Sequence, residues 1–384
     1  MPSRKQSNVT LRKDGLYQAS KVFGYKDNGK PNRKTFYGKT QREALEKLNA
    51  YAREVERGRD VDSGSYTVKA WVELWLETYK LGKLKPHTYD TYELLANNYI
   101  IPSLGKVFID KLKPAAVQGF VNELTGTLSE STIRQTVGVL RGAMKQALHN
   151  RLVVFNPCEG VALPKKQRKR KVGAFSVDEQ RALLQVCSSH RLYALFVFAL
   201  GTGCRIGEIL GLKWEDIDFD SCSATIYQSV SEAKDRDENA PHKRKRIIDD
   251  TKTNASDRTI PLTNDVVAML EQHLERQQLE KGKAGELWKN KGLVFCTVAG
   301  GYLMYRNIRR LYDEQRDKAG VSKLTFHCLR HTFATNAISA GVDYYYLSRI
   351  MGHKHISVTL DTYADFMPDK AAGEAAKMNS ILPL

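Results

Sequence analysis

The segment from Pro164 to Lys171 reads Pro-Lys-Lys-Gln-Arg-Lys-Arg-Lys and constrains the fold more than any other part of the sequence. It has almost no apolar content and a dense positive charge, so it cannot be buried in a core. We interpret it as a solvated linker, on either side of which the chain folds separately. With 384 residues and about 150 residues in an average domain, two or three domains are expected.

The charge of the chain favours a polyanionic partner. Lys and Arg together number 60 against 43 Asp and Glu, which gives a formal net charge of +17, and the 42% hydrophobic content excludes wholesale disorder. The excess is densest in residues 1–64, as in a dedicated nucleic-acid-binding module. A basic linker is usually only a flexible joint, but between two DNA-binding units it can lie across the DNA backbone. The linker side chains expected to contact DNA are Lys165, Lys166, Arg168, Lys169 and Arg170.

The cysteines and the apolar runs argue against an exported or membrane-bound protein. The six cysteines include no CxxC pair, and the residues after Met1 lack the apolar core of a signal peptide. The longest apolar run, Leu192–Leu200, is far shorter than the roughly 20 residues that span a bilayer. We therefore expect reduced thiols and a cytoplasmic protein.

The first 64 residues predict a small β-sheet with one helix. The expected elements are strands at Leu16–Tyr25 and Arg33–Tyr37, a turn at Asp27–Gly29, and a helix that starts with a capping box of Thr40 and Glu43. Many basic side chains surround few apolar ones, which favours DNA contact over a protein-contact role. The candidates for DNA contact are Arg12, Lys13, Lys21, Lys26, Arg33 and Lys34.

Residues 65–163 predict an all-α bundle of about four or five helices, because apolar residues recur there at helical spacing. The expected helical segments are Trp71–Tyr79, Thr88–Tyr99, Pro114–Leu124 and Ser131–Leu148. The Trp and Tyr side chains of the first segment repeat every three to four residues, which favours a core over a base-stacking surface. Lys83 and Lys85 lie in the loop between the first two helices, where they can reach phosphates.

Residues 172–384 predict a mainly α domain with one small antiparallel sheet. The expected elements are helices at 177–187, 191–201 and Arg205–Leu212, strands near Ser223–Tyr227 and Arg258–Pro261, and helices from Thr263 onward interrupted at Gly292–Gly301. Ser176 and Glu179 form a capping box for the first helix. The fold class expected for the whole chain is therefore mainly α and multidomain (α+β), with small sheets in its first and last pieces.

The sequence Thr-Gly-Cys-Arg-Ile-Gly-Glu places Arg205 after a glycine turn, at the start of a helix. Free backbone N–H groups and the helix dipole favour an anion at such a position, and a guanidinium adds bidentate donors. Taken alone, Arg205 and Glu208 more often form an ordinary i,i+3 salt bridge.

A second group of polar residues follows near the C-terminal end. His327 and Arg330 share one helix face at i,i+3, with His331 one step round. His353 follows a glycine, and Tyr363 comes ten residues later. Each of these side chains alone has an ordinary packing explanation. Two arginines, two histidines and a tyrosine in this order are less readily explained by packing alone.

In this combination the sequence resembles the tyrosine recombinases, a family that includes phage and conjugative-transposon integrases. The family pattern is Arg in TGxRxxE, Lys in a β-turn, HxxR, a Gly-His and a Tyr about ten residues on. The matching residues are Arg205, Lys252, His327 with Arg330, His353 and Tyr363, and the resemblance covers roughly residues 172–370. The two preceding pieces resemble that family's arm-binding and core-binding domains. The expected organisation is an arm-type DNA-binding domain at 1–64, a core-binding domain at 65–163, a basic linker at 164–171, and a catalytic domain with a C-terminal tail at 172–384.

The resemblance implies that Tyr363 attacks a DNA phosphodiester and forms a 3′-phosphotyrosyl link. This attack places charge on the nonbridging oxygens, which Arg205 and Arg330 would stabilise. His327 is the candidate base for the phenolic proton, and His353 is expected to donate to a phosphate oxygen.

Lys252 is the candidate acid for the departing 5′-oxygen. Lys234, Lys243 and Lys245 lie in the same stretch, but only Lys252 has the flanking Thr and the strand that follows. Because the covalent ester preserves the bond for religation, the resemblance implies neither a cofactor nor a metal.

The implied partners are double-stranded DNA attachment sites and a homotetramer on paired DNA in a prokaryotic host, at its nucleoid, with directionality or host bending proteins as possible additions. The tail that ends in Ile381-Leu382-Pro383-Leu384 is expected to dock into a neighbouring protomer, the alternative being a frayed terminus.

Other functions remain open at this point. A zinc hydrolase using His327, His331, His353 and His355 is disfavoured because no HExxH motif is present. A non-catalytic DNA-binding regulator leaves the position of Tyr363 unexplained. An Xer-type resolvase usually starts directly at the helical bundle, and a type IB topoisomerase shares the chemistry without a fixed target sequence.

Overall fold

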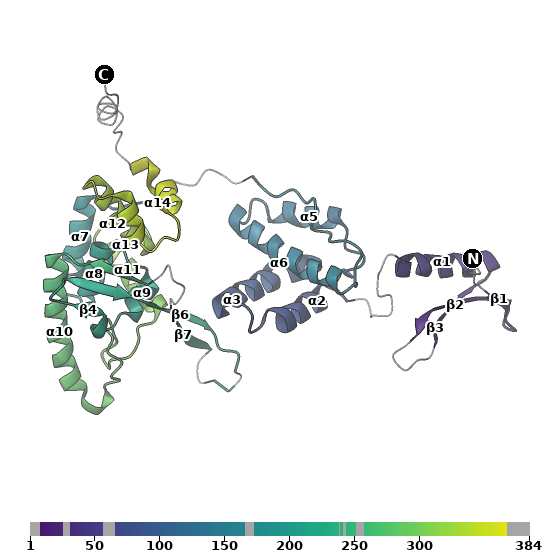
Figure 1. Cartoon of the computed structure of the whole chain (residues 1–384), viewed down its shortest axis with the longest axis horizontal. Coiled ribbons are helices and arrows are strands. Elements are labelled where there is room, and N and C mark those ends of the chain that lie inside the picture. Colours follow the sequence, from purple (N-terminus) through teal and green to yellow (C-terminus); the bar gives the residue numbers. More distant parts are fainter. Residues whose placement is uncertain are drawn as a thin grey trace, which may run out of the picture. The chain divides into compact units, whose positions relative to one another are not determined.

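The computed structural model describes residues 8–25, 31–56, 66–165, 173–237, 239–240, 243–250 and 257–366. The chain divides into two compact units, Met1–Arg168 and Lys169–Leu384. It is mainly helical with small antiparallel sheets (Figure 1), which confirms the expected fold class. In these stretches no helix is both long and apolar enough to cross a membrane. Several predicted features lie outside the described residues, namely Lys26, the Asp27–Gly29 turn, residues 166–171 of the linker, Lys252 and the tail from residue 367.

The N-terminal module is a three-stranded antiparallel sheet with one helix. Its elements are β1 (Asn8–Leu11), β2 (Tyr17–Tyr25), β3 (Pro31–Gly38) and α1 (Gln41–Glu56), in the sheet order β1-β2-β3. The expected pairing of the two longer strands is confirmed, with Ala19 opposite Phe36. Strand β1 was not predicted, because four residues with mixed polarity carry too weak an alternation to mark a strand.

The start of α1 differs in one detail from the expected capping box. The backbone N–H of Glu43 donates to the Thr40 hydroxyl at 3.1 Å, as expected. The Glu43 carboxylate accepts from the backbone N–H of Lys39 at 2.7 Å rather than from Thr40. The N-cap bond from Thr40 is therefore present, and the Glu43 carboxylate binds the N–H of the residue before the cap.

The helical bundle contains a core of tryptophans and aliphatic residues. Its elements are α2 (Val68–Trp75), a π-helical turn (Leu76–Lys80), α3 (Pro86–Leu95), a second π-helical turn (Ala96–Ile100), α4 (Ile101–Leu104), α5 (Pro114–Leu124) and α6 (Glu130–His149). Trp71 and Trp75 are buried, and the Trp71 indole N–H donates to the carbonyl of Ala143 at 2.8 Å. The prediction that the aromatic side chains of this first helical segment belong to a core, rather than to a base-stacking surface, is therefore confirmed.

The C-terminal unit surrounds the apolar helix α8. Its helices are α7 (Val177–Cys187), α8 (Tyr193–Thr202), α9 (Ile206–Gly211), α10 (Asn264–Ala284), α11 (Tyr305–Lys318), α12 (His327–Ser339), α13 (Tyr344–Ile350) and α14 (Ile356–Tyr363). The capping box of Ser176 and Glu179 at α7 is confirmed. Helices α7, α10 and α12 all contact α8. This packing brings the end of α8 close to the start of α12.

The expectation of one sheet in this unit is wrong. One sheet has the order β4-β5-β8, formed by Ile217–Asp218, Ser223–Ile226 and Arg258–Pro261. A second consists of β6 (Gln228–Lys234) and β7 (Arg244–Asp250), which pair in an antiparallel register. Polar and charged residues predominate in both of these strands, so they lack the alternation of apolar and polar residues that marks a half-buried strand.

Candidate active site

Arg205 stands at a sharp reversal between α8 and α9. Gly203 has φ +64°, and a Cβ at this position would overlap the ring of Phe333. A glycine is therefore required for the turn. Arg205 is the residue that precedes α9, and its side chain is 42% exposed.

Glu208 holds the guanidinium of Arg205 in place. Its carboxylate accepts from Arg205 Nη1 at 2.9 Å and from the Arg205 backbone N–H at 2.8 Å. The i,i+3 salt bridge considered as the ordinary explanation is thus present. This salt bridge does not use all the N–H donors of Arg205. A second described bond of the side chain goes to the carbonyl of Gly352 at 3.0 Å, and a guanidinium has five N–H donors.

Arg258 pairs with the same carboxylate from the other side. Its Nη2 and Nη1 atoms donate to Glu208 at 2.7 and 3.2 Å, and its Nε donates to the carbonyl of Ile350 at 2.5 Å. Burial raises the pKa of the Glu208 carboxyl, but Arg258 and Arg205 outweigh this effect and hold the pKa below its usual value. Glu208 therefore remains ionised and fixes both arginines.

Arg330 joins two loops of the unit. It is only 4% exposed, and it donates from Nη1 to the carbonyl of Gly203 at 2.8 Å and from Nη2 to that of Met351 at 2.6 Å. Burial lowers the pKa of Arg330 to about 10, so the guanidinium stays charged at neutral pH. Arg330 and Arg205 thus converge on the turn formed by Met351 and Gly352.

His353 follows this turn directly. Its Nε2 lies 2.9 Å from Arg330 Nη2, and its Nδ1 lies 2.7 Å from the Thr359 hydroxyl. Because a guanidinium only donates, we assign Nε2 as the acceptor and the proton to Nδ1. Burial, with Arg330 and Arg205 nearby, lowers the pKa of His353 to about 4, which agrees with a neutral ring.

Tyr363 is the last residue of α14, and its side chain is 1% exposed. The ring packs in an apolar cluster with Ala334, Ile338, Leu347 and Met351. Its hydroxyl lies 2.8 Å from Nδ1 of His331. Burial raises the pKa of Tyr363 to about 12, so the phenol is protonated at neutral pH.

His327 was predicted to be the base for the phenol, but the described hydrogen bond is made by His331. The ring of His327 lies edge-on to that of His331, with centroids 4.7 Å apart. No hydrogen bond between His327 and Tyr363 occurs in the described part of the chain. The i+4 spacing of His331 from His327 was the available signal, because it places both rings on one helix face.

A cavity of about 960 Å³ opens beside this cluster. Its lining includes Arg258, Gly352 and His353 together with Lys354 and Tyr345. Asp257, where the described chain resumes after residues 251–256, also lines it. Lys252 itself lies outside the described residues.

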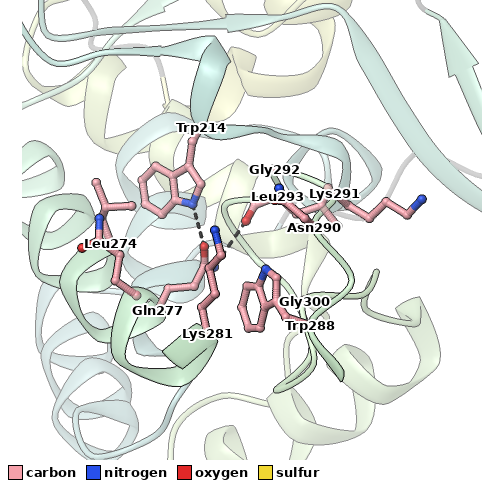
Figure 2. Close-up of a pocket in the computed structure, with 11 residues that line it drawn as sticks. Trp214, Leu274, Gln277, Lys281, Trp288, Asn290, Lys291, Gly292, Leu293 and Gly300 are labelled. Atoms are coloured by element: carbon pink, nitrogen blue, oxygen red, sulfur yellow. Dashed lines mark hydrogen bonds between the residues drawn. The ribbon is translucent and has the colours of Figure 1, made fainter. Parts of the chain in front are cut away.

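A second, smaller cavity lies beside α10 and has a volume of about 160 Å³. Figure 2 shows Trp214 and Trp288 at its walls, with Gln277 between them. Gln277 accepts from the Trp214 indole N–H at 2.7 Å and donates to the carbonyl of Val294 at 2.8 Å. Because both the oxygen and the NH₂ group of the Gln277 amide have hydrogen-bond partners, we assign this residue a structural role in holding α10 against the loops that contain Trp214 and Val294.

The predicted DNA contacts are spread over the described surface. Arg12 and Lys13 lie in the β1–β2 turn, Lys21 on β2, Arg33 and Lys34 on β3, Lys83 and Lys85 between the first helices of the bundle, and Lys165 at the end of the described bundle unit. The Arg12 guanidinium lies over the ring of Tyr37 at 5.0 Å. Lys26, Lys166, Arg168, Lys169 and Arg170 lie outside the described residues. Among the residues described, no group of three or more His, Cys, Asp or Glu is arranged to hold a metal ion.

Comparison with protein families shows which family the chain belongs to. The profile of the phage integrase family matches residues 174–369, and that of the phage integrase N-terminal SAM-like domain matches residues 67–125. The chain belongs to the phage integrase family. The resemblance to tyrosine recombinases found in the sequence is thereby confirmed, and the chain is a tyrosine-type site-specific recombinase.

Integrases and recombinases from bacteria are similar along nearly the whole chain. A tyrosine recombinase XerC-like protein of Caldanaerobacter subterraneus is 32% identical over 388 residues, covering 98% of this chain and 99% of the relative. The ICEBs1 integrase of Bacillus subtilis is 23% identical, covering 98% of this chain and 100% of that one.

Solved integrase structures share the fold. The integrase of transposon Tn1549, in complex with circular intermediate DNA, is similar with a TM-score of 0.64 and 21% identity, over 83% of this chain and 100% of that chain. A lambda integrase tetramer bound to a Holliday junction is similar with a TM-score of 0.60 and 18% identity, over 96% of this chain and 97% of that chain.

Proposed function

We propose that this recombinase integrates and excises a mobile element by cleaving and rejoining DNA at paired attachment sites, with Tyr363 as the nucleophile. The observation that carries the proposal is the convergence of Arg205 and Arg330 on the Met351–Gly352 turn, in the same part of the unit as Tyr363. Transfer of a DNA phosphoryl group to a phenol requires fixed cations around the phosphate more than any other feature.

The two arginines would have different tasks. Arg205 is partly exposed, and its described bonds use two of the five N–H donors of a guanidinium, so it is suited to bind a nonbridging phosphate oxygen. Arg330 is buried and bonded to two carbonyl groups, so it supplies positive charge and holds the turn. Both contributions stabilise the negative charge that develops on the phosphate oxygens in the transition state.

His353 needs a change of partner to play its expected role. With Nδ1–H donating to Thr359 and Nε2 accepting from Arg330, it has no N–H left for a phosphate. A bound phosphate that draws Arg330 away, or that raises the pKa of His353, would place a proton on Nε2. We propose this step as part of substrate binding.

Lys252 is proposed as the acid that protonates the 5′-oxygen. The described chain resumes at Asp257, which lines the cavity beside His353. A 5′-bridging phosphorothioate has a much better leaving group, so it should restore cleavage to Lys252→Ala but not to Arg330→Ala. Failure of this rescue would assign the acid to another side chain, with Lys234, Lys243 and Lys245 as the next candidates.

The N-terminal module at 1–64 is proposed to bind a second, arm-type DNA site. Helix α1 covers one face of the sheet, where Ala19, Ala44 and Leu48 are buried. The strand register turns alternate residues to the other face, including Gln18, Thr35 and Tyr37. A face of polar side chains bordered by Arg12, Lys13 and Arg33 suits contact with a DNA groove.

The remaining assignments follow the same logic. Residues 65–163, with Lys83 and Lys85, are proposed to contact the crossover site, and the linker at 164–171 to follow the DNA backbone. We propose a homotetramer on paired double-stranded DNA, since exchange of two duplexes requires cleavage of every strand, with the tail after Pro368 docking into the neighbouring protomer. The place of action would be the cytoplasm of a prokaryotic host, at its nucleoid, with directionality or host bending proteins as further partners.

Covalent trapping tests the proposed function. Protein–DNA adducts are isolated from cells that carry the element, and the attached DNA is sequenced to obtain the cleavage position. We expect adducts with the unaltered protein and none with Tyr363→Phe, while Tyr345→Phe, at an exposed tyrosine of α13, remains active. Adduct DNA from the ends of a mobile element supports an integrase, and a chromosomal dimer-resolution site would instead support an Xer-type resolvase, as the XerC-like relative suggests. Full adduct formation by Tyr363→Phe would overturn the nucleophile assignment.

A further inference from the structure

The phenolic oxygen of Tyr363 has a hydrogen-bond partner that the family motif does not include. His331 Nδ1 lies 2.8 Å from this oxygen, and the two rings meet edge-on with centroids 5.7 Å apart. A phenol becomes an effective nucleophile as its proton leaves. A base for this proton must lie within hydrogen-bond distance of the hydroxyl, and His331 meets the requirement.

We propose that His331 is the general base that takes the phenolic proton of Tyr363, an assignment that rests on the recombinase function proposed above. As the bond between the Tyr363 oxygen and phosphorus forms, the phenolic proton moves to Nδ1 and the bond from phosphorus to the 5′-oxygen breaks. The 5′-oxygen leaves with a proton from the acid. In religation the 5′-hydroxyl attacks phosphorus and returns its proton to the conjugate base of the acid, while the imidazolium returns its proton to the departing tyrosine oxygen.

The geometry fixes both ends of the tyrosine side chain. Ala334, Ile338, Leu347 and Met351 hold the ring by apolar contact, and His331 binds the hydroxyl. His331 lies one turn after the start of α12, whereas the described contact of the His327 ring with this pair is its edge-on contact with His331. Pairing of Tyr363 with His331 is thus a consequence of how α12, α13 and α14 pack.

The protonation states suit the start of the reaction. Burial, with His327 and Arg330 nearby, lowers the pKa of His331 to about 4, and burial raises the pKa of Tyr363 to about 12. At neutral pH the imidazole is therefore neutral and the phenol is protonated. The groups that face His331 are His327 and Arg330 on its own helix, Tyr363 on α14, and His353 before α14. An incoming phosphate adds negative charge that favours the imidazolium.

Two asparagine variants test the assignment. His331→Asn keeps a polar atom near the position of Nδ1 but cannot take up a proton, and His327→Asn is the matched change at the other histidine. Adduct formation is measured in single turnovers on a nicked duplex with the sequence recovered from covalent adducts. We expect His331→Asn to be slower by about 10² to 10⁴-fold, the usual contribution of a general base, and His327→Asn to lose less. His149→Gln, at an exposed histidine of α6, should match the unaltered protein.

The pH profile separates a catalytic role from a structural one. Without a base the reaction depends on phenolate, so the rate of His331→Asn should rise about tenfold per pH unit above neutrality, toward the raised pKa of Tyr363. The unaltered protein should show no such rise, and added imidazole should restore cleavage to His331→Ala. A wild-type rate for His331→Asn, a slower rate with an unchanged profile, or a faster rate because Tyr363 is released would each overturn the proposal. A chain whose unaltered form makes no adduct would instead overturn the proposed function.

Discussion

Replacement of Arg258 by methionine should destabilise the catalytic unit and leave the helical bundle unaffected. Arg258 and Glu208 are 8% and 4% exposed, and the change removes two charge-assisted hydrogen bonds from the carboxylate. Loss of one partner of a buried ion pair costs about 3–5 kcal/mol. Because Arg205 still donates twice to Glu208, we expect the lower end, about 3 kcal/mol. At about 2–4 °C per kcal/mol for a unit of this size, the melting temperature should fall by about 6–12 °C.

Differential scanning calorimetry of the full chain measures this change, and the bundle transition provides an internal reference. Arg181→Met is the matched control, because Arg181 and Asp178 form an ion pair on the surface, worth at most about 1 kcal/mol. Glu208 has a lowered pKa in the folded state, so its stabilisation is present above the unfolded value and is lost as the pH falls through the folded one. The difference between Arg258→Met and the unaltered protein should therefore shrink in acid. An unchanged melting temperature, or an equal loss at neutral and acidic pH, would refute this reasoning.

Three further predictions concern the site and the N-terminal module. Arg205→Ala and Arg330→Ala should each slow single-turnover cleavage by about 10² to 10³-fold with little change in DNA affinity, and a neutral effect at either would make that arginine structural. Gly352→Ala should cost about 1–2 kcal/mol by calorimetry, because its φ is +64°, and should slow cleavage since the new Cβ would lie 2.9 Å from Arg258 Nη1. Deletion of residues 1–64 should spare cleavage of a short crossover duplex but reduce integration on long attachment-site DNA, and equal loss of both would make the module part of the core fold.

Local signals explain which elements could be predicted from the sequence. The bounds of α5 (Pro114–Leu124) and α7 (Val177–Cys187) agree with the expected ones, because a first-turn proline or a capping box marks the start and an apolar stripe follows. The strands β6 and β7 carry no such signal. Their paired residues are separated by 9 to 21 intervening residues, and this pairing depends on contacts between the two strands rather than on local periodicity.

The same distinction applies to the site. The resemblance of the motif pattern to the tyrosine recombinases predicted that Arg205, Arg330 and Tyr363 belong to one site, because their order along the chain is distinctive. The choice between His327 and His331 as the partner of the phenol could not be made from spacing, since both lie on one face of α12. It depends on where the end of α14 meets α12, which only the tertiary packing determines.

Identification of the residue that becomes linked to DNA tests the central claim most directly. Adducts trapped on a nicked duplex would be digested with protease and nuclease, and the nucleotide-bearing peptide sequenced by mass spectrometry. The account predicts a single modified residue, Tyr363, esterified to a 3′-phosphate, with a free 5′-hydroxyl on the released strand. Attachment at another residue, including the neighbouring Tyr344, Tyr345 and Tyr346, or attachment through a 5′-phosphate, would contradict it.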